Sequence, residues 1–186
     1  MFINHNEKKL IHALIYFLNH TSWSGKKKLY KLLFVLDFEH YALTGRSVTG
    51  LDYFAWKMGP VPTALHEAID SEDDLIQNAF RIEIKRKKQY TTVFLHPKID
   101  FDERYFSKRQ LRLLKDIVQR FDMASGEDMV WFTHQEMMPW HKVWEVEGRK
   151  QEKIPYEYAL DSLDNETHAL ILDFTQERQA FLTHFQ

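Results

Sequence analysis

A helical pattern of apolar residues dominates the stretch from residue 24 to residue 44. One face follows the i, i+3, i+4, i+7 spacing of a helix: Leu29, Leu32, Leu33, Leu36, His40 and Leu43. A second apolar row lies beside it: Tyr30, Phe34, Phe38 and Tyr41. Together the rows cover roughly half of the circumference at about 100° per residue. The pattern therefore predicts a buried central helix, over about residues 24–44, that its neighbours contact on several sides.

The ends and the polar side of this helix are also indicated by the sequence. Ser24 is expected to cap the first turn with its side-chain oxygen. Gly45 is expected to end the helix in a left-handed conformation. The remaining arc carries charged residues, which we expect to face solvent: Lys27, Lys28, Lys31 and Glu39.

A period of two predicts a small antiparallel β-hairpin over about residues 80–96. Three apolar residues alternate with charged ones: Phe80, Ile82 and Ile84. A second alternating segment follows at Tyr90–His96. Because a lone hairpin is barely stable, it is expected to lie on the helices. The extended segment Asp52–Met58 is a candidate third strand of its sheet.

Further helices are predicted from capping signals. Asn4 and Glu7 form a capping-box pattern for an N-terminal helix, and Thr63–Ile69 reads as a short helix. Starts of later helices are indicated at three positions: Ser107, Ser125 and Pro139. Ser71–Asp74 is expected to be an acidic loop. The fold class is therefore mainly α (α+β).

The chain length predicts one domain over residues 1–186, with residues 161–186 as an appended C-terminal helix. Asp164 is the expected cap of that helix. Its expected apolar face is formed by six residues: Leu170, Ile171, Phe174, Phe181, Leu182 and Phe185.

The amino-acid composition argues against several classes of protein. The net charge of −2 gives no general field for nucleic acid, and the absence of cysteine excludes disulfides and thiolate metal or redox sites. The N-terminal residues lack the order of a signal peptide, and the longest strongly apolar run, Ala13–Leu18, is short of the roughly 20 residues of a bilayer span. A cytoplasmic protein without a membrane segment is expected.

Asp37 falls inside the apolar arc of the central helix. A buried carboxylate must be hydrogen-bonded or paired to stay ionised. We expect Asp37 to accept amide hydrogens from the turn at residues 46–50, or a Tyr, Trp or Lys donor. The alternative is a catalytic carboxylate, since perturbed carboxylates also occur at active sites.

His134, Glu136 and His141 form the most enzyme-like cluster. They lack the His-Glu-x-x-His spacing of a zinc site, and spacing nominates no third ligand. His134 is therefore expected to be a hydrogen-bonded histidine near Trp131, Trp140 and Trp144. With no cysteine, no Gly-x-Ser-x-Gly elbow and no phosphate-binding glycine pattern, neither an enzyme nor a cofactor is predicted. A metal-dependent hydrolase remains an alternative.

Two basic clusters, Lys26–Lys31 and Lys85–Lys88, suggest contact surfaces. The second lies at the expected hairpin tip, where four residues are candidates for partner binding: Arg86, Lys87, Lys88 and Tyr90. Basic residues beside an aromatic ring also suit nucleic acid. Acidic loops balance these clusters, so a protein partner is favoured, and a nucleic-acid-binding autoregulator remains an alternative.

The stretch Gly25–Pro62 resembles the Panacea domain of the SocA-like antitoxins, a family common in bacteria and their phages. The resemblance is carried by Lys28-Leu-x-Lys31-Leu-Leu-Phe-x-x-Asp37-Phe-x-His40, Thr44-Gly45-x-x-x-Thr49-Gly50, Asp52-Tyr53 and Ala55-Trp56-Lys57-x-Gly59-Pro60-Val61-Pro62. Later matching segments are Thr133-His134-x-Glu136, Pro139-Trp140 and Ile154-Pro155-Tyr156-Glu157. The signature thus includes six polar residues singled out here: Asp37, His40, Thr49, Lys57, His134 and Glu136.

The resemblance implies an antitoxin that neutralises a toxin encoded by a neighbouring gene, through direct protein–protein contact and without catalysis. It names neither the toxin nor the binding surface. A proteolysis adaptor or a phage accessory protein is an alternative, and the oligomeric state stays open. From the basic, aromatic tip at Arg86–Tyr90 we hypothesise that an edge built from the hairpin and the C-terminal tail contacts the partner.

Overall fold

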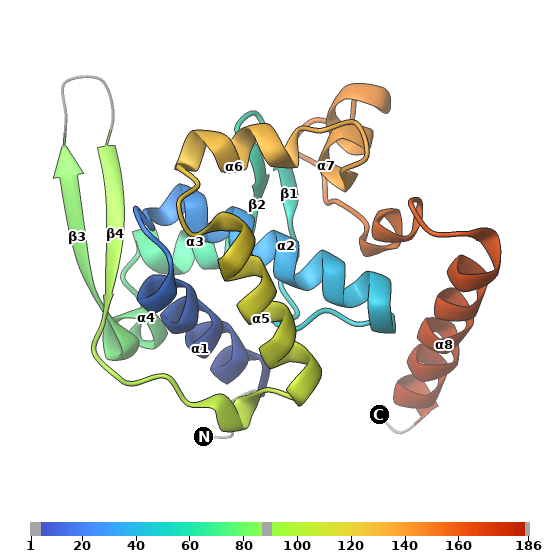
Figure 1. Ribbon diagram of the computed structural model, residues 1–186, viewed down its shortest axis with the longest axis horizontal. Helices are drawn as coiled ribbons and strands as arrows, with labels where there is room; N and C mark the ends of the chain where they lie inside the picture. The colour runs from blue at the N-terminus through green and yellow to red at the C-terminus, as the bar shows by residue number, and fades with distance from the viewer. Residues whose placement is uncertain (1–4, 87–90, 185–186) are drawn as a thin grey trace.

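The computed structural model describes residues 5–86 and 91–184 and shows a mainly α fold with a small β component (Figure 1). Asn4, Lys87–Tyr90 and Phe185, which carry parts of the predictions above, lie outside these residues. The helices are α1 (His5–His20), α2 (Lys26–Thr44), α3 (Thr63–Asp70), α4 (Asp74–Ala79), α5 (Lys108–Phe121), α6 (Gly126–Thr133), α7 (Pro139–His141) and α8 (Asn165–His184). The strands are β1 (Phe54–Trp56), β2 (Gly59–Val61), β3 (Phe80–Arg86) and β4 (Thr91–Pro97). Short helical turns, η1 to η3, cover Glu103–Tyr105, Lys142–Val146 and Tyr156–Leu160.

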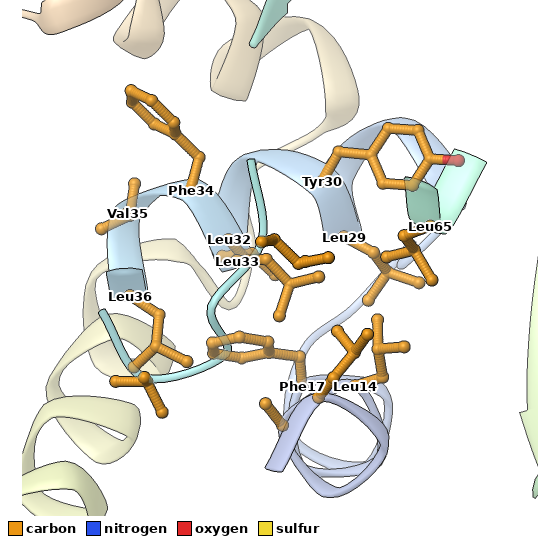
Figure 2. Close-up of a cluster of buried hydrophobic side chains, with 14 of the residues drawn as sticks. Leu14, Phe17, Leu29, Tyr30, Leu32, Leu33, Phe34, Val35, Leu36 and Leu65 are labelled. Carbon is orange, nitrogen blue, oxygen red and sulfur yellow. The ribbon is translucent and has the colours of Figure 1, made fainter. Parts of the chain in front are cut away.

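Helix α2 is the buried centre of the molecule, as the sequence predicts. Thirteen of its nineteen residues are buried, and helices α1, α5 and α6 as well as strand β2 contact it. Figure 2 shows Leu14 and Phe17 of α1 directed towards the leucines of α2, while Phe34 extends from another side of the helix. A helix that is apolar nearly all round is stable only when it is covered in this way.

The ends of α2 confirm one prediction and correct another. Gly45 ends the helix in the left-handed conformation, with φ of 67°. The residue that caps the start is Gly25, without a side-chain hydrogen bond. Ser24 donates its hydroxyl hydrogen to the carbonyl oxygen of Thr21 and closes the preceding loop instead, so the prediction that it caps α2 is wrong.

The predicted hairpin is present as β3 and β4, paired antiparallel from Phe80↔Pro97 to Arg86↔Thr91. The segment expected as its third strand forms a separate sheet, because β1 pairs with β2 (Phe54↔Val61, Trp56↔Gly59). Pro60 lacks an amide hydrogen, and a two-stranded sheet tolerates this because both of its strands are edges.

Gly59 makes the close approach of β2 to α2 possible. Its φ is +98°, which residues with a Cβ rarely adopt. A Cβ at this position would lie 2.9 Å from both Cε of Lys31 and the hydroxyl of Thr133. The Gly-Pro-Val-Pro segment therefore packs directly on α2 and α6.

The remaining helices largely follow their capping signals. Ser107 and Ser125 each form a complete capping box, the second with Asp128. Helix α4 was not expected, because residues 71–74 read as an acidic loop. Asp73 caps it by accepting the amide hydrogen of Ile76.

Helix α8 begins where Asp164 accepts the amide hydrogen of Thr167, but its expected apolar face is only partly covered. Ile171 is buried with Tyr41 and Leu160, whereas Leu170 and Phe174 are exposed. Helix α8 and the hairpin lie at opposite ends of the long axis (Figure 1). They do not form one edge, so the hypothesis of a joint hairpin-and-tail contact surface is wrong.

Among the described residues, none of the helices combines the length and the apolar composition that crossing a bilayer requires.

Candidate functional site

The carboxylate of Asp37 is a fully buried acceptor of four hydrogen bonds. The amides of Val48 and Thr49 donate to Oδ1 at 2.7 and 2.8 Å. The hydroxyl of Thr49 and that of Tyr53, the latter at 2.7 Å, donate to Oδ2. The predicted hydrogen bonds from the turn are therefore confirmed, and they join α2 to the segment that leads into β1.

Burial raises the pKa of Asp37, and the four donated hydrogen bonds oppose this rise because they stabilise the carboxylate. With 0% exposure and both oxygens occupied, Asp37 has no face open to a substrate. Glu136, by contrast, is exposed. The geometry does not bring Asp37 and Glu136 into one solvent-filled site, and it matches a structural acceptor.

Two other signature residues, His40 and Lys57, lie in α2 and in the β1–β2 turn. Nδ1 of His40 donates to the carbonyl oxygen of Arg46 at 2.6 Å, and this fixes the tautomer because a carbonyl only accepts. Burial lowers the pKa of His40; the hydrogen bond to Arg46 opposes this fall, and the nearby charges of Lys9, Arg109 and Arg46 add to it. Lys57 is exposed in the turn between β1 and β2.

His134 lies flat on Trp140, with ring centroids 3.6 Å apart and an interplanar angle of 3°. Its Nε2 is buried without a hydrogen-bond partner among the described residues, as is Nδ1 of His141. The prediction of a hydrogen-bonded imidazole is therefore wrong, because stacking holds the ring instead. Burial, with Lys31 nearby, lowers the pKa of His134. Trp131, expected in the same cluster, is exposed.

Residues 5–86 and 91–184 contain no group of three or more His, Asp or Glu side chains placed to hold a metal ion. The indole nitrogen of Trp140 instead donates to the carbonyl oxygen of Trp56 at 2.9 Å. Trp140 therefore links α7 to the last residue of β1.

Lys28 and Lys31 are buried, which corrects the expectation that they face solvent. Nζ of Lys28 donates to the carbonyl oxygens of Ser22 and Asp122, at 2.8 and 2.7 Å. Nζ of Lys31 donates to the carbonyl oxygen of Pro60 at 3.2 Å. Burial lowers the pKa of both, that of Lys31 to about 7. A helix wheel places these lysines on the polar side of α2, but in the fold β2, α6 and the Ser22 loop cover that side.

A groove of about 950 Å³, here called the hairpin groove, opens at the N-terminal end of α2. Residues Thr91–Val93 of β4 form one wall, and the start of α6 forms another. Three large side chains in its lining are exposed: Trp23 (65%), Trp56 (36%) and Met58 (46%). They lie outside the residues predicted as binding residues.

The charges of the hairpin groove are largely compensated within it. Lys26 pairs with Asp70, and Lys27 lies 3.5 Å from Glu127. This groove therefore presents exposed aromatic and apolar surface beside neutralised cations.

A second groove, here called the basic groove, holds about 1420 Å³ between α1, the C-terminal end of α2, the start of α5 and α8. It is lined by seven cationic side chains: Lys9, Arg46, Arg104, Lys108, Arg109, Arg112 and Lys153. Glu157 is its one acidic lining residue. No local sequence pattern indicates this groove, because its cations come from four separate segments of the chain.

The start of α5 did carry a signal for the basic groove. Lys108 and Arg109 are its first two residues, and its first turn contains no acidic residue. Cations at the positive end of a helix dipole cost about 0.3–1 kcal/mol each. Positions that oppose the dipole are candidates for a role outside helix stability.

Of the predicted partner-binding residues, Arg86 is the exposed last residue of β3, and Lys87, Lys88 and Tyr90 lie outside the described residues. Lys85 lies over the ring of Phe94, 4.9 Å from its centroid, and 3.5 Å from Glu83. Lys85 therefore already has partners within the hairpin, and Arg86 is the exposed cation of the described part of the tip.

Comparison with known proteins identifies the chain. Searches among curated proteins and among solved structures gave no match. The family model of the antitoxin SocA-like Panacea domain matches residues 29–141. This range runs from the first buried leucine of α2 to the end of α7 and includes Asp37, His134 and Trp140. Because the match spans more than half of the chain, the protein belongs to the family of SocA-like antitoxins with a Panacea domain.

Proposed function

We propose that this protein is an antitoxin that neutralises a partner toxin by direct binding, without catalysis. The observation that carries the proposal is the family match over residues 29–141. The partner is proposed to be the product of a neighbouring gene, and the encounter to take place in the cytoplasm.

The hairpin groove is the surface proposed for this contact. Trp and other large apolar side chains supply much of the binding energy of protein interfaces, and Trp23, Trp56 and Met58 are exposed there. The groove is built on α2, α6, the β1–β2 hairpin and β4, and buried contacts hold α6 and β2 against α2. Little conformational entropy would be lost when a partner binds such a surface.

The proposal is tested by co-expression with the neighbouring gene product. Rescue of growth and a complex that co-purifies are expected for the wild-type chain. The proposal fails if the neighbouring product is toxic and the wild-type chain neither rescues growth nor co-purifies with it.

A further inference from the structure

The basic groove differs from the rest of the surface in its charge. The chain as a whole has a net charge of −2, yet this one groove is lined by seven cations and a single carboxylate. The remainder of the molecule therefore carries an excess of acidic residues. The groove is therefore a local region of positive charge on a molecule whose other residues are acidic on balance.

Within the described part of the chain, most of these cations have no anionic partner. Arg104 pairs with Asp102 and Lys153 with Asp52. The other five make no ion pair with any residue in the part of the chain that the structure describes: Lys9, Arg46, Lys108, Arg109 and Arg112. Four of these five are exposed, and Lys9 is half-buried. Their charges are thus available to a ligand.

The groove also contains exposed apolar side chains. Leu43 of α2 and Phe174 of α8 line it and are 60% and 59% exposed. Its volume of about 1420 Å³ exceeds the roughly 300–1,000 Å³ of small-molecule pockets. The lining therefore fits a ligand that combines negative charge with an apolar group and is larger than a metabolite.

We propose that the basic groove binds an acidic polypeptide segment of a partner protein, with an apolar side chain of that segment packed against Leu43 and Phe174. A nucleic-acid backbone would make no use of the two apolar residues, and the rest of the chain, which is acidic on balance, adds no general attraction for it. The electrostatic field of the groove's cations decays over about 8 Å at physiological ionic strength. A short acidic segment can lie entirely within that distance of the cations. This site is separate from the hairpin groove and does not depend on the proposed function.

The test uses two fluorescent acidic peptides that differ at one central position, Phe in one and Ser in the other. Fluorescence anisotropy is measured with the full-length wild-type chain, with R109E/R112E and with K115E. Lys115 is exposed on the same helix but does not line the groove. An acidic residue at position 109 favours the helix dipole of α5, and a circular dichroism melting curve like that of the wild type shows that R109E/R112E remains folded.

The wild-type chain and K115E are expected to bind the Phe peptide alike, and R109E/R112E to bind it about tenfold more weakly or worse. The wild-type preference for the Phe peptide over the Ser peptide is expected to disappear in F174S. The proposal is overturned by absence of wild-type binding, by equal losses in K115E and R109E/R112E, or by a preference that F174S retains. Tighter binding of a DNA duplex of equal charge, or self-association that R109E/R112E abolishes, would also overturn it, in favour of a nucleic acid or a second copy.

Discussion

The hydroxyl of Tyr53 donates a 2.7 Å hydrogen bond to Oδ2 of Asp37, and both side chains are fully buried. Together with the donors of Val48 and Thr49, this bond fixes the segment before β1 against α2. The carboxylate is therefore a connection between the central helix and the signature segment that follows it.

Asp37→Asn is expected to lower the free energy of unfolding by about 2–4 kcal/mol, because an amide replaces a charged acceptor that four donors face. Urea denaturation measures this change. Antitoxin activity, assayed well below the midpoint of the variant, is expected to persist. A variant of wild-type stability that had lost activity would contradict the structural role of Asp37.

Lys31→Met is expected to flatten the pH dependence of stability above neutral pH. The pKa of Lys31 is about 7 in the folded chain and near 10.5 when unfolded. Between these values the unfolded chain binds more protons, so stability rises with pH by up to about 1.4 kcal/mol per unit. Below pH 7 Lys31 is protonated in both states, so it no longer makes the free energy of unfolding depend on pH.

Chemical denaturation of wild type and Lys31→Met between neutral and mildly alkaline pH checks the prediction. The difference between the two chains isolates Lys31 from the other titrating groups. If the free energies of unfolding of the two chains changed with pH in parallel, Lys31 would be solvated and the prediction would be wrong.

Gly59→Ala is expected to destabilise the protein much more than Gly148→Ala. Both glycines have positive φ, at 98° and 67°, and each substitution strains the backbone by about 1–3 kcal/mol. Only at Gly59 would the new Cβ also collide, 2.9 Å from Lys31 and Thr133, whereas nothing lies within 4 Å at Gly148. Thermal unfolding compares the two variants, and equal losses would contradict the close packing of β2.

The features that the sequence predicted correctly depend on local patterns. The central helix, the hairpin and the capping boxes at Ser107 and Ser125 follow from spacing within one segment. The acceptor role of Asp37 was predictable because a carboxylate on an apolar face requires donors.

The features that the sequence missed depend on tertiary contacts. Lys28 and Lys31 lie on the polar side of a helix wheel, and only the packing of β2, α6 and the Ser22 loop shows that they are buried. The basic groove joins Lys9, Arg46 and the start of α5, which no spacing rule relates. Similarly, Trp23 and Met58 are isolated apolar residues in the sequence, and folding places both in the hairpin groove.

Growth of cells that produce the neighbouring gene product tests the central claim most directly. Rescue is compared for the wild-type chain, for W23A/W56A in the hairpin groove and for W131A. Trp131 is a matched control, since it is exposed and does not line the groove. Wild type and W131A are expected to restore growth and to retain the toxin on co-purification, whereas W23A/W56A is expected to do neither while remaining folded. Full rescue by W23A/W56A would contradict the hairpin groove as the contact surface, and absence of rescue by the wild-type chain would contradict neutralisation by direct binding.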